Sequence, residues 1–260
     1  MEAHPPKRPI VGLLTDFGQQ DHYVGVVKAV LAGIVPQALV IDVTHEVPPQ
    51  DLLAGQRLLR ASQPYFPAGT IFLAIVDPGV GSRRRGMALS HGGQIFVGPD
   101  NGLFTPWTTG EWLAVELTAS HYQLPSVSST FHGRDIFAPA AAYLATGVPL
   151  LELGPELHDP VRLLPPSPLL RSDGTIEGEL VYVDHFGNLI SNIARVTGGS
   201  IRFRDLNLPL RHTYAETGPN ELLALVGSEG EVEIAQRDGS AAASLGARLG
   251  ERLIWIPPPA

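Results

Sequence analysis

Three aspartates, Asp16, Asp77 and Asp184, each come directly after a short apolar segment that is typical of a buried strand. In open α/β sheets, ligands bind beyond the carboxyl ends of the strands, so a carboxylate at such a position is a candidate site residue. Aspartate is also common in the turns that follow strands. Position alone therefore leaves both interpretations open for each of the three residues.

The segment after Asp77 is rich in glycine and leads into three consecutive arginines. Residues 79–82 read Gly-Val-Gly-Ser, and such a loop lets the backbone approach a ligand closely. The segment matches neither the P-loop nor the GxGxxG dinucleotide pattern. The arginines at 83–85 either form a solvated basic face, or one of them folds back and keeps the Asp77 carboxylate ionised and oriented.

His132 lies in the segment Phe-His-Gly-Arg-Asp, at the start of a helix predicted for residues 131–147. The positive end of a helix dipole favours the neutral imidazole, which can accept a proton. The alternative is a histidine with a purely structural role. The nine histidines of the chain form no HExxH motif and no clear ligand pair, so the sequence predicts no metal site.

Asp16 and Asp21 precede a helix predicted for residues 23–34. Asp16 is the better placed of the two to reach a ligand, and a carboxylate that accepts hydrogen bonds from two neighbouring hydroxyls is a common way to hold a ribose. Asp21 directly precedes the helix and is expected to act as its N-cap.

Two glycine-containing segments in the second half of the chain could bind a nucleoside. Phe186 and Asn188 suit a purine, because the ring can stack on the base and the amide can pair with its edge. Ser228, which is bracketed by glycines, suits contacts to a small polar ligand. Spacing alone nevertheless favours a hairpin turn for both segments.

The elements that must position these residues alternate between strand and helix in the first half of the chain. Apolar runs predict strands at 10–14, 38–43, 70–76 and 94–97, and helical periodicity predicts helices at 23–34, 51–62 and 131–147. This order is typical of a mostly parallel α/β sandwich with helices on both faces of the sheet.

A proline cluster at residues 163–168 marks a change in organisation. Beyond it the helical periodicity fades, and six short strand candidates follow at even spacing, at 175–184, 189–193, 201–203, 222–226, 231–235 and 252–256. This pattern predicts a small β-barrel or sandwich. We therefore expect an N-terminal α/β domain at residues 1–164 and a C-terminal β-barrel domain at residues 165–260.

Composition limits the class of protein and its partners. A net charge of -8 argues against a nucleic-acid partner and against binding to anionic membranes, because both need a basic face. The chain has no cysteine, which excludes disulfides, thiolate catalysis and cysteine-bound zinc. The polar, proline-rich start at residues 1–9 shows no signal peptide, and no apolar run is long enough to span a membrane. The expected location is the cytoplasm.

Five segments together resemble the S-adenosylmethionine hydroxide adenosyltransferases, the hydrolase relatives of the fluorinating and chlorinating adenosyl enzymes. The resemblance extends from about residue 10 to residue 256. Its most specific parts are residues 15–18, 76–82, 98–102, 131–135 and 186–188, which occur in the family's order.

The resemblance implies a homotrimer with active sites at the subunit interfaces. It implies that water cleaves S-adenosylmethionine to adenosine and L-methionine without a cofactor. The family's catalytic residues fall on Asp77, on His132 and on Arg84, because the family's arginine follows its aspartate by seven positions. The expected substrate-binding residues are Asp16 for the ribose, Asn188 for the adenine, and Asp21, Asp184, Phe186, Ser228, Glu233 and Gln236.

Two residues differ from the halogenating relatives. Those enzymes have a tyrosine where Asp77 stands, and a carboxylate there repels a halide. They have an arginine near the methionine carboxylate where this chain has Glu229. The alternatives to a hydrolase are a 5′-halogenase and a non-catalytic adenosine-binding protein; the latter has no use for Asp77, Arg84 and His132 together.

Overall fold

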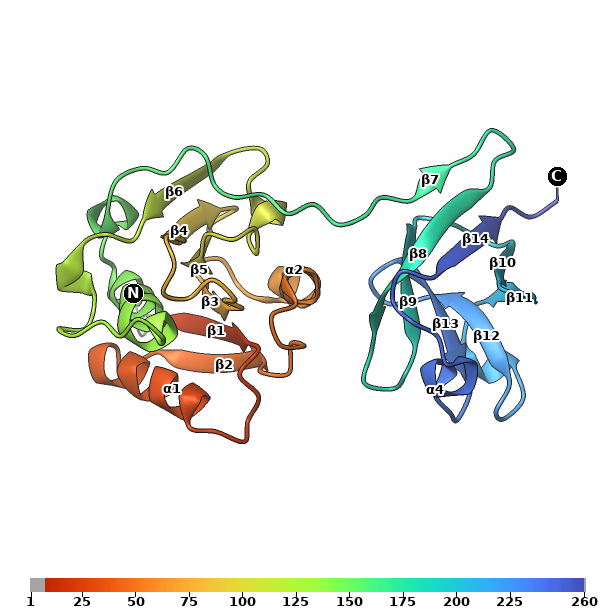
Figure 1. The fold of residues 1–260 in the computed structure, drawn as a ribbon, viewed down its shortest axis with the longest axis horizontal. Helices are drawn as coiled ribbons and strands as arrows, with labels where there is room; N and C mark the ends of the chain where they lie inside the picture. The colour runs from red at the N-terminus through yellow and green to blue at the C-terminus, as the bar shows by residue number, and fades with distance from the viewer. Residues whose placement is uncertain (1–7, 260) are drawn as a thin grey trace, which may run out of the picture. The chain divides into compact units, whose positions relative to one another are not determined.

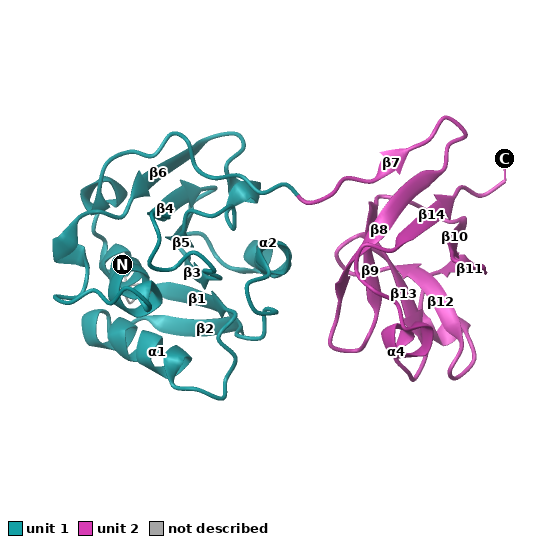
Figure 2. Cartoon of the chain, in the orientation of Figure 1, with its two compact units in different colours: residues 1–164 teal, residues 165–260 magenta. Residues whose placement is uncertain are grey.

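The structure is a computed structural model that describes residues 8–259. The predicted absence of a signal peptide concerns a segment that lies almost wholly outside the described residues. The chain folds as two compact units, unit 1 up to Leu164 and unit 2 from Pro165 onward (Figure 2). Within residues 8–259, no helix is long and apolar enough to cross a bilayer.

Unit 1 is built on one six-stranded sheet with the order β2-β1-β3-β5-β4-β6 (Figure 1). The first four strands in this order are parallel, and β4 is antiparallel to both of its neighbours. The strands are β1 (Ile10–Thr15), β2 (Leu39–Thr44), β3 (Ile71–Ile75), β4 (Gly86–His91), β5 (Gln94–Pro99) and β6 (Trp112–Glu116). The predicted mostly parallel sheet is confirmed, although β4 and β6 were not expected from the sequence.

Helices cover the two faces of this sheet. On one face, α1 (Tyr23–Ile34) and α3 (Ala138–Thr146) share a core with β1 and β3. On the other face, α2 (Leu52–Ser62) contacts β1 and the turn at Thr105–Trp107, whose Trp107 ring stacks on Phe96. This division follows from the strand period, because alternate side chains of a strand point to opposite faces.

The start of α1 corrects one prediction. The N-cap of this helix is His22, and no side chain caps it, so the assignment of Asp21 as the N-cap is wrong. The helix starts one residue too late for Asp21 to occupy the capping position. By contrast, the Asp51 side chain accepts a hydrogen bond from the Ala54 N–H and caps α2.

The predicted helix at 131–147 consists of two parts. Residues Gly133–Phe137 form a π-helical turn, and α3 continues from it with Pro139 as its second residue. The carbonyl of Asp135, four residues before the proline, accepts from the Leu124 N–H instead. Gly147 ends α3 with a φ of 100°, as the sequence predicted. Short 3-10 turns occur at Gln63–Tyr65, Thr105–Trp107, Ser120–Tyr122, Leu150–Leu153 and, in unit 2, Tyr214–Glu216.

Unit 2 is a β-barrel, as predicted. Its strand order is β14-β10-β11-β12-β13-β9-β8, and pairing of β14 with β8 closes the ring. The strands are β8 (Ile176–Val183), β9 (Leu189–Ala194), β10 (Ser200–Phe203), β11 (Leu206–Arg211), β12 (Leu222–Val226), β13 (Glu231–Gln236) and β14 (Arg252–Ile256), with β7 (Leu169–Leu170) added outside β8 and a short helix α4 (Ala241–Leu245). The six predicted strands did not include β11, which contains Pro209, and proline is uncommon inside strands.

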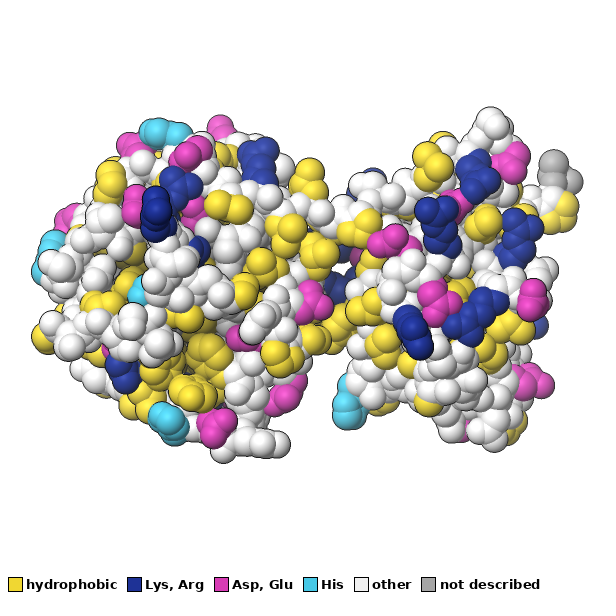
Figure 3. Space-filling view, viewed as in Figure 1, with side chains coloured by type: hydrophobic (Ala, Val, Ile, Leu, Met, Phe, Trp, Pro, Cys, Tyr) yellow, Lys and Arg dark blue, Asp and Glu magenta, His cyan; other side chains and the backbone are white. Residues whose placement is uncertain are grey.

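Both units carry a mixed surface. On the face shown in Figure 3, acidic and basic side chains are interspersed over each unit, and hydrophobic side chains lie between them. On this face, neither acidic nor basic side chains form one continuous patch.

Candidate active site

A cavity of about 520 Å³ opens in unit 1 beyond the carboxyl ends of β1 and β3. Asp16 directly follows β1 and Asp77 follows β3, and these strands are parallel neighbours in which Thr15 pairs with Ile75. Both aspartates therefore reach the same cavity, as ligand-binding residues do in open α/β sheets. Its lining comprises Asp16, Phe17, Tyr23, Pro49, Gln50, Ile75, Asp77, Pro78, Val80, Ser128, Thr130, Phe131, His132, Gly133 and Arg134.

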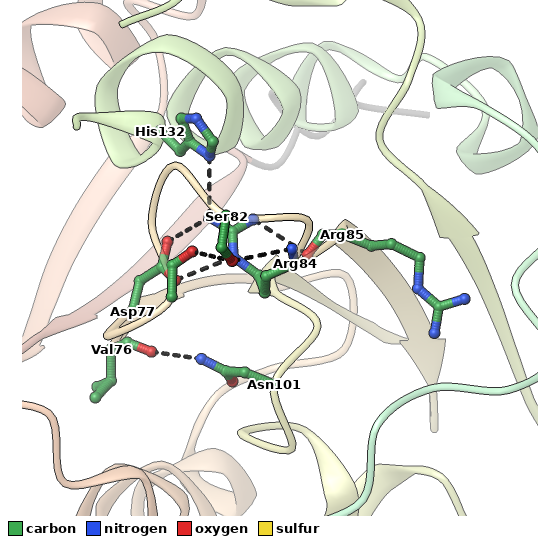
Figure 4. Close-up of polar contacts among 8 residues, drawn as sticks. Val76, Asp77, Ser82, Arg84, Arg85, Asn101 and His132 are labelled. Carbon is green, nitrogen blue, oxygen red and sulfur yellow. Dashed lines mark hydrogen bonds and ion pairs between the residues drawn. The ribbon is translucent and has the colours of Figure 1, made fainter. Parts of the chain in front are cut away.

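Arg84 is the one of the three consecutive arginines that folds back onto Asp77 (Figure 4). Its Nε donates to Oδ1 at 3.0 Å and its Nη2 donates to Oδ2 at 2.5 Å, so the pair is bidentate. The side chains of Arg84 and Asp77 are only 8% and 7% exposed. Such a pair fixes the plane of the carboxylate oxygens.

The glycine-rich loop makes this return possible. The Ser82 hydroxyl donates to the Gly79 carbonyl at 2.7 Å and accepts from the Arg84 N–H at 3.2 Å. Gly81 has a φ of 78°, and a Cβ there would lie 2.3 Å from the Ser129 carbonyl oxygen. Glycine is therefore required at residue 81, both for its backbone conformation and for the close approach of the 129 segment.

His132 receives a hydrogen bond from the same arginine, 48 positions away in sequence. The Nη2 of Arg84 lies 3.0 Å from Nδ1 of His132, and because guanidinium only donates, Nδ1 is the acceptor. Burial, and then the charge of Arg84, lower the pKa of His132. The ring is therefore neutral at neutral pH and carries its proton on Nε2.

The π-helical turn places His132 over the end of β3. Gly133 is buried, and a Cβ at this residue would lie 3.2 Å from the Ile75 side chain, so glycine lets the turn pack against the strand. Phe137, at the end of the turn, is fully buried and lies under the guanidinium of Arg84, 5.1 Å from its centre. Arg84 does not line the cavity, so it acts through Asp77 and His132.

Asp16 is held by the backbone of Gln50. The Gln50 N–H donates to Oδ2 of Asp16 at 2.8 Å, and Gln50 adopts a φ of 66°, which is uncommon for a residue other than glycine. Burial raises the pKa of Asp16, and the charge of Asp77 adds to this effect. The two carboxylates thus share one cavity, but only Asp77 has an arginine as its counter-ion.

The segment at 98–102, one of the five segments that carry the family resemblance, supports the site from behind. The Asn101 amide donates to the Val76 carbonyl at 2.9 Å, which ties down the residue before Asp77 (Figure 4). Arg85 contacts Asp100 and Asp159, so it is not part of a solvated basic face. The sequence marked residues 98–102 as a family segment, but it could not show the hydrogen bond from Asn101 to Val76, because the two residues are 25 positions apart.

In unit 2, Asp184 and Asn188 close the hairpin between β8 and β9. Oδ1 of Asp184 accepts from the N–H groups of Phe186 and Asn188, at 2.9 and 2.8 Å, and Oδ2 accepts from the Asn188 side-chain amide at 2.8 Å. Asn188 is 7% exposed, whereas the Phe186 ring is 73% exposed. The hairpin therefore presents an exposed aromatic ring next to an oriented amide.

The other predicted residues of unit 2 lie on or near β13. Ser228 is exposed in the turn between β12 and β13, which is a hairpin, as spacing indicated. The Gln236 amide donates to the Asn220 carbonyl at 2.8 Å. Glu233 is 7% exposed and accepts from the Tyr214 hydroxyl, and burial together with this contact raises the pKa of Tyr214. The sequence did not predict Tyr214, because no motif marks it.

The side chains of the site are those of an acid–base or hydrolytic centre rather than a metal centre. In the part of the chain that the structure describes, no group of three or more histidine, aspartate or glutamate side chains could hold a metal ion. Asp21, which was expected to bind substrate, is exposed and does not line the cavity of unit 1.

Comparisons with known proteins give a consistent result. A family model described as "SAM hydroxide adenosyltransferase N-terminal domain" matches residues 11–154, and the corresponding C-terminal domain model matches residues 178–254. Proteins named (R)-S-adenosyl-L-methionine hydrolase from Salinispora tropica and Thermus thermophilus are each 42% identical, over 94% of this chain and 97% of their own. A fluorinase from an Actinoplanes species is 30% identical over 81% of this chain and 84% of its own. The crystal structure of an uncharacterized conserved protein from Thermotoga maritima superposes with a TM-score of 0.86 at 33% identity, covering 94% of this chain and 98% of that one.

Proposed function

The chain belongs to the SAM hydroxide adenosyltransferase family, and we propose that its reaction takes place in the cavity beside Asp77. The protein is an enzyme that hydrolyses S-adenosyl-L-methionine: water or hydroxide attacks C5′ and releases adenosine and L-methionine. The observation that supports this location is the bidentate pair of Asp77 and Arg84, which joins His132 at the wall of the cavity.

The chemistry needs a positioned water more than it needs an acid. The sulfonium leaves as a neutral thioether, so the C5′–S bond breaks without protonation of the leaving group. The new C5′–O bond forms from a water, which loses one proton in the process. The main tasks of the site are therefore to hold the water in line with the C5′–S bond and to take up that proton.

We assign the water to Asp77. Arg84 occupies one lone-pair direction on each oxygen of this carboxylate, and the remaining lone pairs can accept from a water in the cavity. A carboxylate also accepts the proton readily once the C5′–O bond begins to form, because the attacking oxygen becomes acidic. The same negative charge repels a halide, which disfavours the halogenase alternative.

The sequence predicted His132 as the proton acceptor, but the hydrogen-bond geometry favours another role. Arg84 occupies the Nδ1 lone pair, so the neutral ring carries its proton on Nε2 and can only donate there. We assign His132 to positioning the water oxygen through Nε2. Arg84 then fixes both partners of the water and stabilises negative charge as hydroxide character develops.

We propose that Asp16 accepts from the two ribose hydroxyls, with the Gln50 N–H fixing its orientation. We also propose that Asn188 and Phe186 bind the adenine, since the amide is fixed and the ring is exposed. The remaining substrate-binding residues stay as predicted from the sequence: Asp21, Asp184, Ser228, Glu233 and Gln236.

Several finer features are part of the same proposal. The names of the curated relatives support the (R) sulfonium epimer as the substrate. The family resemblance supports a homotrimer with active sites at the subunit interfaces and no cofactor. A cytoplasmic location stays a prediction from the sequence. Light scattering on the purified protein tests the trimer, because it measures the mass of the assembly directly.

One incubation tests the reaction. The protein is mixed with an epimeric mixture of S-adenosyl-L-methionine, with and without chloride, and the products are separated by chromatography. We expect adenosine and L-methionine in equal amounts, with loss of the (R) epimer only. A 5′-chloroadenosine product would indicate a halogenase, and unchanged substrate with tight binding would indicate a binding protein.

A further inference from the structure

The cavity of unit 1 contains one permanently charged cation on its wall. Among the residues that line it, Arg134 is the only arginine or lysine, whereas Asp16 and Asp77 are carboxylates. His132 also lines the cavity, but burial and the charge of Arg84 lower its pKa, so it contributes no positive charge near neutral pH. Arg134 has no part in the water-positioning arrangement described above.

The hydrogen bonds of Arg134 leave one edge of its guanidinium for a ligand. Its Nε donates to Oδ1 of Asp135 at 2.5 Å, and its Nη2 donates to Oδ2 at 2.9 Å. These contacts use the edge formed by Nε and one N–H of Nη2. The opposite edge, formed by Nη1 and the second N–H of Nη2, has the spacing that binds a carboxylate through two parallel hydrogen bonds.

The position of this guanidinium is well defined. Asp135 is fully buried and also accepts from the Ser128 N–H at 2.8 Å, so it forms a rigid anchor behind the arginine. The guanidinium lies over the Phe131 ring, 5.0 Å from its centre, and its side chain is 35% exposed. A fixed, half-exposed arginine loses little entropy when it binds an anion.

The π-helical turn accounts for this arrangement. It places His132 and Arg134 on the cavity wall while the Asp135 side chain points into the protein. π-helical turns are rare and occur frequently at functional sites. The turn and its N-cap thus supply His132 and a separate cation, Arg134, to the lining of one cavity.

We propose that Arg134 binds the α-carboxylate of the methionine portion of the substrate; this inference rests on the proposed function. S-adenosyl-L-methionine carries one carboxylate, and charge complementarity matches it to the single cation of the cavity wall. Glu229, at the position where the halogenating relatives have an arginine, is exposed and acidic and cannot take this role. Arg134 is therefore a specificity-determining residue that distinguishes substrates with a carboxylate from those without.

The test compares two substrates that differ only in this group. Initial rates are measured with S-adenosyl-L-methionine, in the epimer that the wild type consumes, and with decarboxylated S-adenosylmethionine. For Arg134→Gln, we expect KM for the first substrate to rise about 10-fold or more, since the variant loses a hydrogen-bonded charge pair. The same substitution should change KM for the decarboxylated substrate by less than about 2-fold.

Two further variants make the test decisive. Arg83→Gln removes the same charge from an exposed residue of unit 1 that does not line the cavity, and it should leave both KM values unchanged. If Arg134→Gln does not fold, Arg134→Lys replaces it, because lysine keeps the charge next to Asp135 but lacks the planar fork. The same selective rise in KM for S-adenosyl-L-methionine is then expected. Circular dichroism and adenosine binding show that each variant is intact.

The outcomes separate the inference from the proposed function. Equal losses with both substrates, or no loss with either, would overturn the role of Arg134 and leave it as a structural partner of Asp135. A wild-type protein that releases no adenosine from S-adenosyl-L-methionine would instead contradict the proposed function. A selective loss that abolishes the preference for the carboxylated substrate supports the assignment.

Discussion

The carboxylate of Asp77 and the guanidinium of Arg84 form a bidentate pair, with 3.0 Å from Nε to Oδ1 and 2.5 Å from Nη2 to Oδ2, and both side chains are more than nine-tenths buried. The pair is local in sequence, since its members are seven positions apart. It nevertheless borders the cavity, because Asp77 lines it while Arg84 lies behind. The Asp77 carboxylate can thus face a ligand while the Arg84 guanidinium holds that carboxylate in place.

The substitution Asp77→Asn tests this pair. The amide has nearly the same shape, but it cannot take a proton and leaves Arg84 buried without a counter-ion. We expect kcat to fall about 100-fold or more and the free energy of unfolding to fall by about 3 kcal/mol. Single-turnover rates and urea unfolding measure the two effects. Unchanged kcat would remove Asp77 from the mechanism.

The lowered pKa of His132 predicts a pH dependence of stability. The folded protein disfavours protonation of this ring, so the unfolded state binds more protons between the lowered pKa and the ordinary value of about 6.5. The contribution of His132 to stability is therefore full above about pH 6.5 and is lost as the pH falls toward the lowered pKa. Urea unfolding of the wild type and of His132→Gln between pH 5 and pH 8 measures it. The difference in the free energy of unfolding between the two proteins should shrink toward low pH; a constant difference would contradict the lowered pKa of His132.

The same ring predicts the pH dependence of turnover. A protonated Nδ1 cannot accept from Arg84, so activity should fall at acid pH with an apparent pKa below the usual value for histidine. The measurement is kcat against pH. In Arg84→Gln, the positive charge beside the ring is lost, so the acid limb should move to higher pH as kcat falls.

The close approach at Gly81 predicts that Gly81→Ala destabilises the protein more than the control substitution Gly110→Ala does. Gly81 and Gly110 both have left-handed backbones, with φ of 78° and 68°, but only at Gly81 would a Cβ meet another atom, the Ser129 carbonyl oxygen. Gly110→Ala should cost about 1 kcal/mol from the backbone alone. Gly81→Ala should cost clearly more and should also lower kcat, because it displaces the loop that carries Arg84. Thermal unfolding of the two variants in parallel gives the comparison; equal losses would mean that the close approach has no consequence.

Asp16 predicts a selective effect on ribose recognition. A carboxylate can accept a hydrogen bond from each of two hydroxyls, whereas an amide has only one acceptor oxygen, so the substitution should weaken binding of the ribose. We expect Asp16→Asn to weaken adenosine binding about 10-fold and to weaken 2′-deoxyadenosine binding less. Calorimetric titration with both nucleosides measures the coupling. If the variant weakens both equally, Asp16 does not contact the 2′-hydroxyl.

The sequence alone determined those features that depend on short-range patterns. Helix α1 at Tyr23–Ile34 and the stop at Gly147 were predictable because periodicity and a left-handed glycine act within a few residues. The glycine-rich loop indicated that one of the arginines at 83–85 could fold back onto Asp77, and the family resemblance singled out Arg84. The barrel was predictable as a class of fold, but its strand with Pro209 was not, since a local rule disfavoured it.

Only the tertiary structure decided how distant groups meet. It brought His132 to Arg84 across 48 positions, and the direction of that hydrogen bond placed the proton on Nε2 and changed the role of the ring. It showed that Asp21 is not the N-cap of α1, and that Arg134 shares the cavity wall with Asp16 and Asp77. The reason is physical: spacing determines which neighbours a residue can reach along the chain, whereas protonation, burial and charge pairing depend on contacts that form only when the sheet and the π-helical turn pack together.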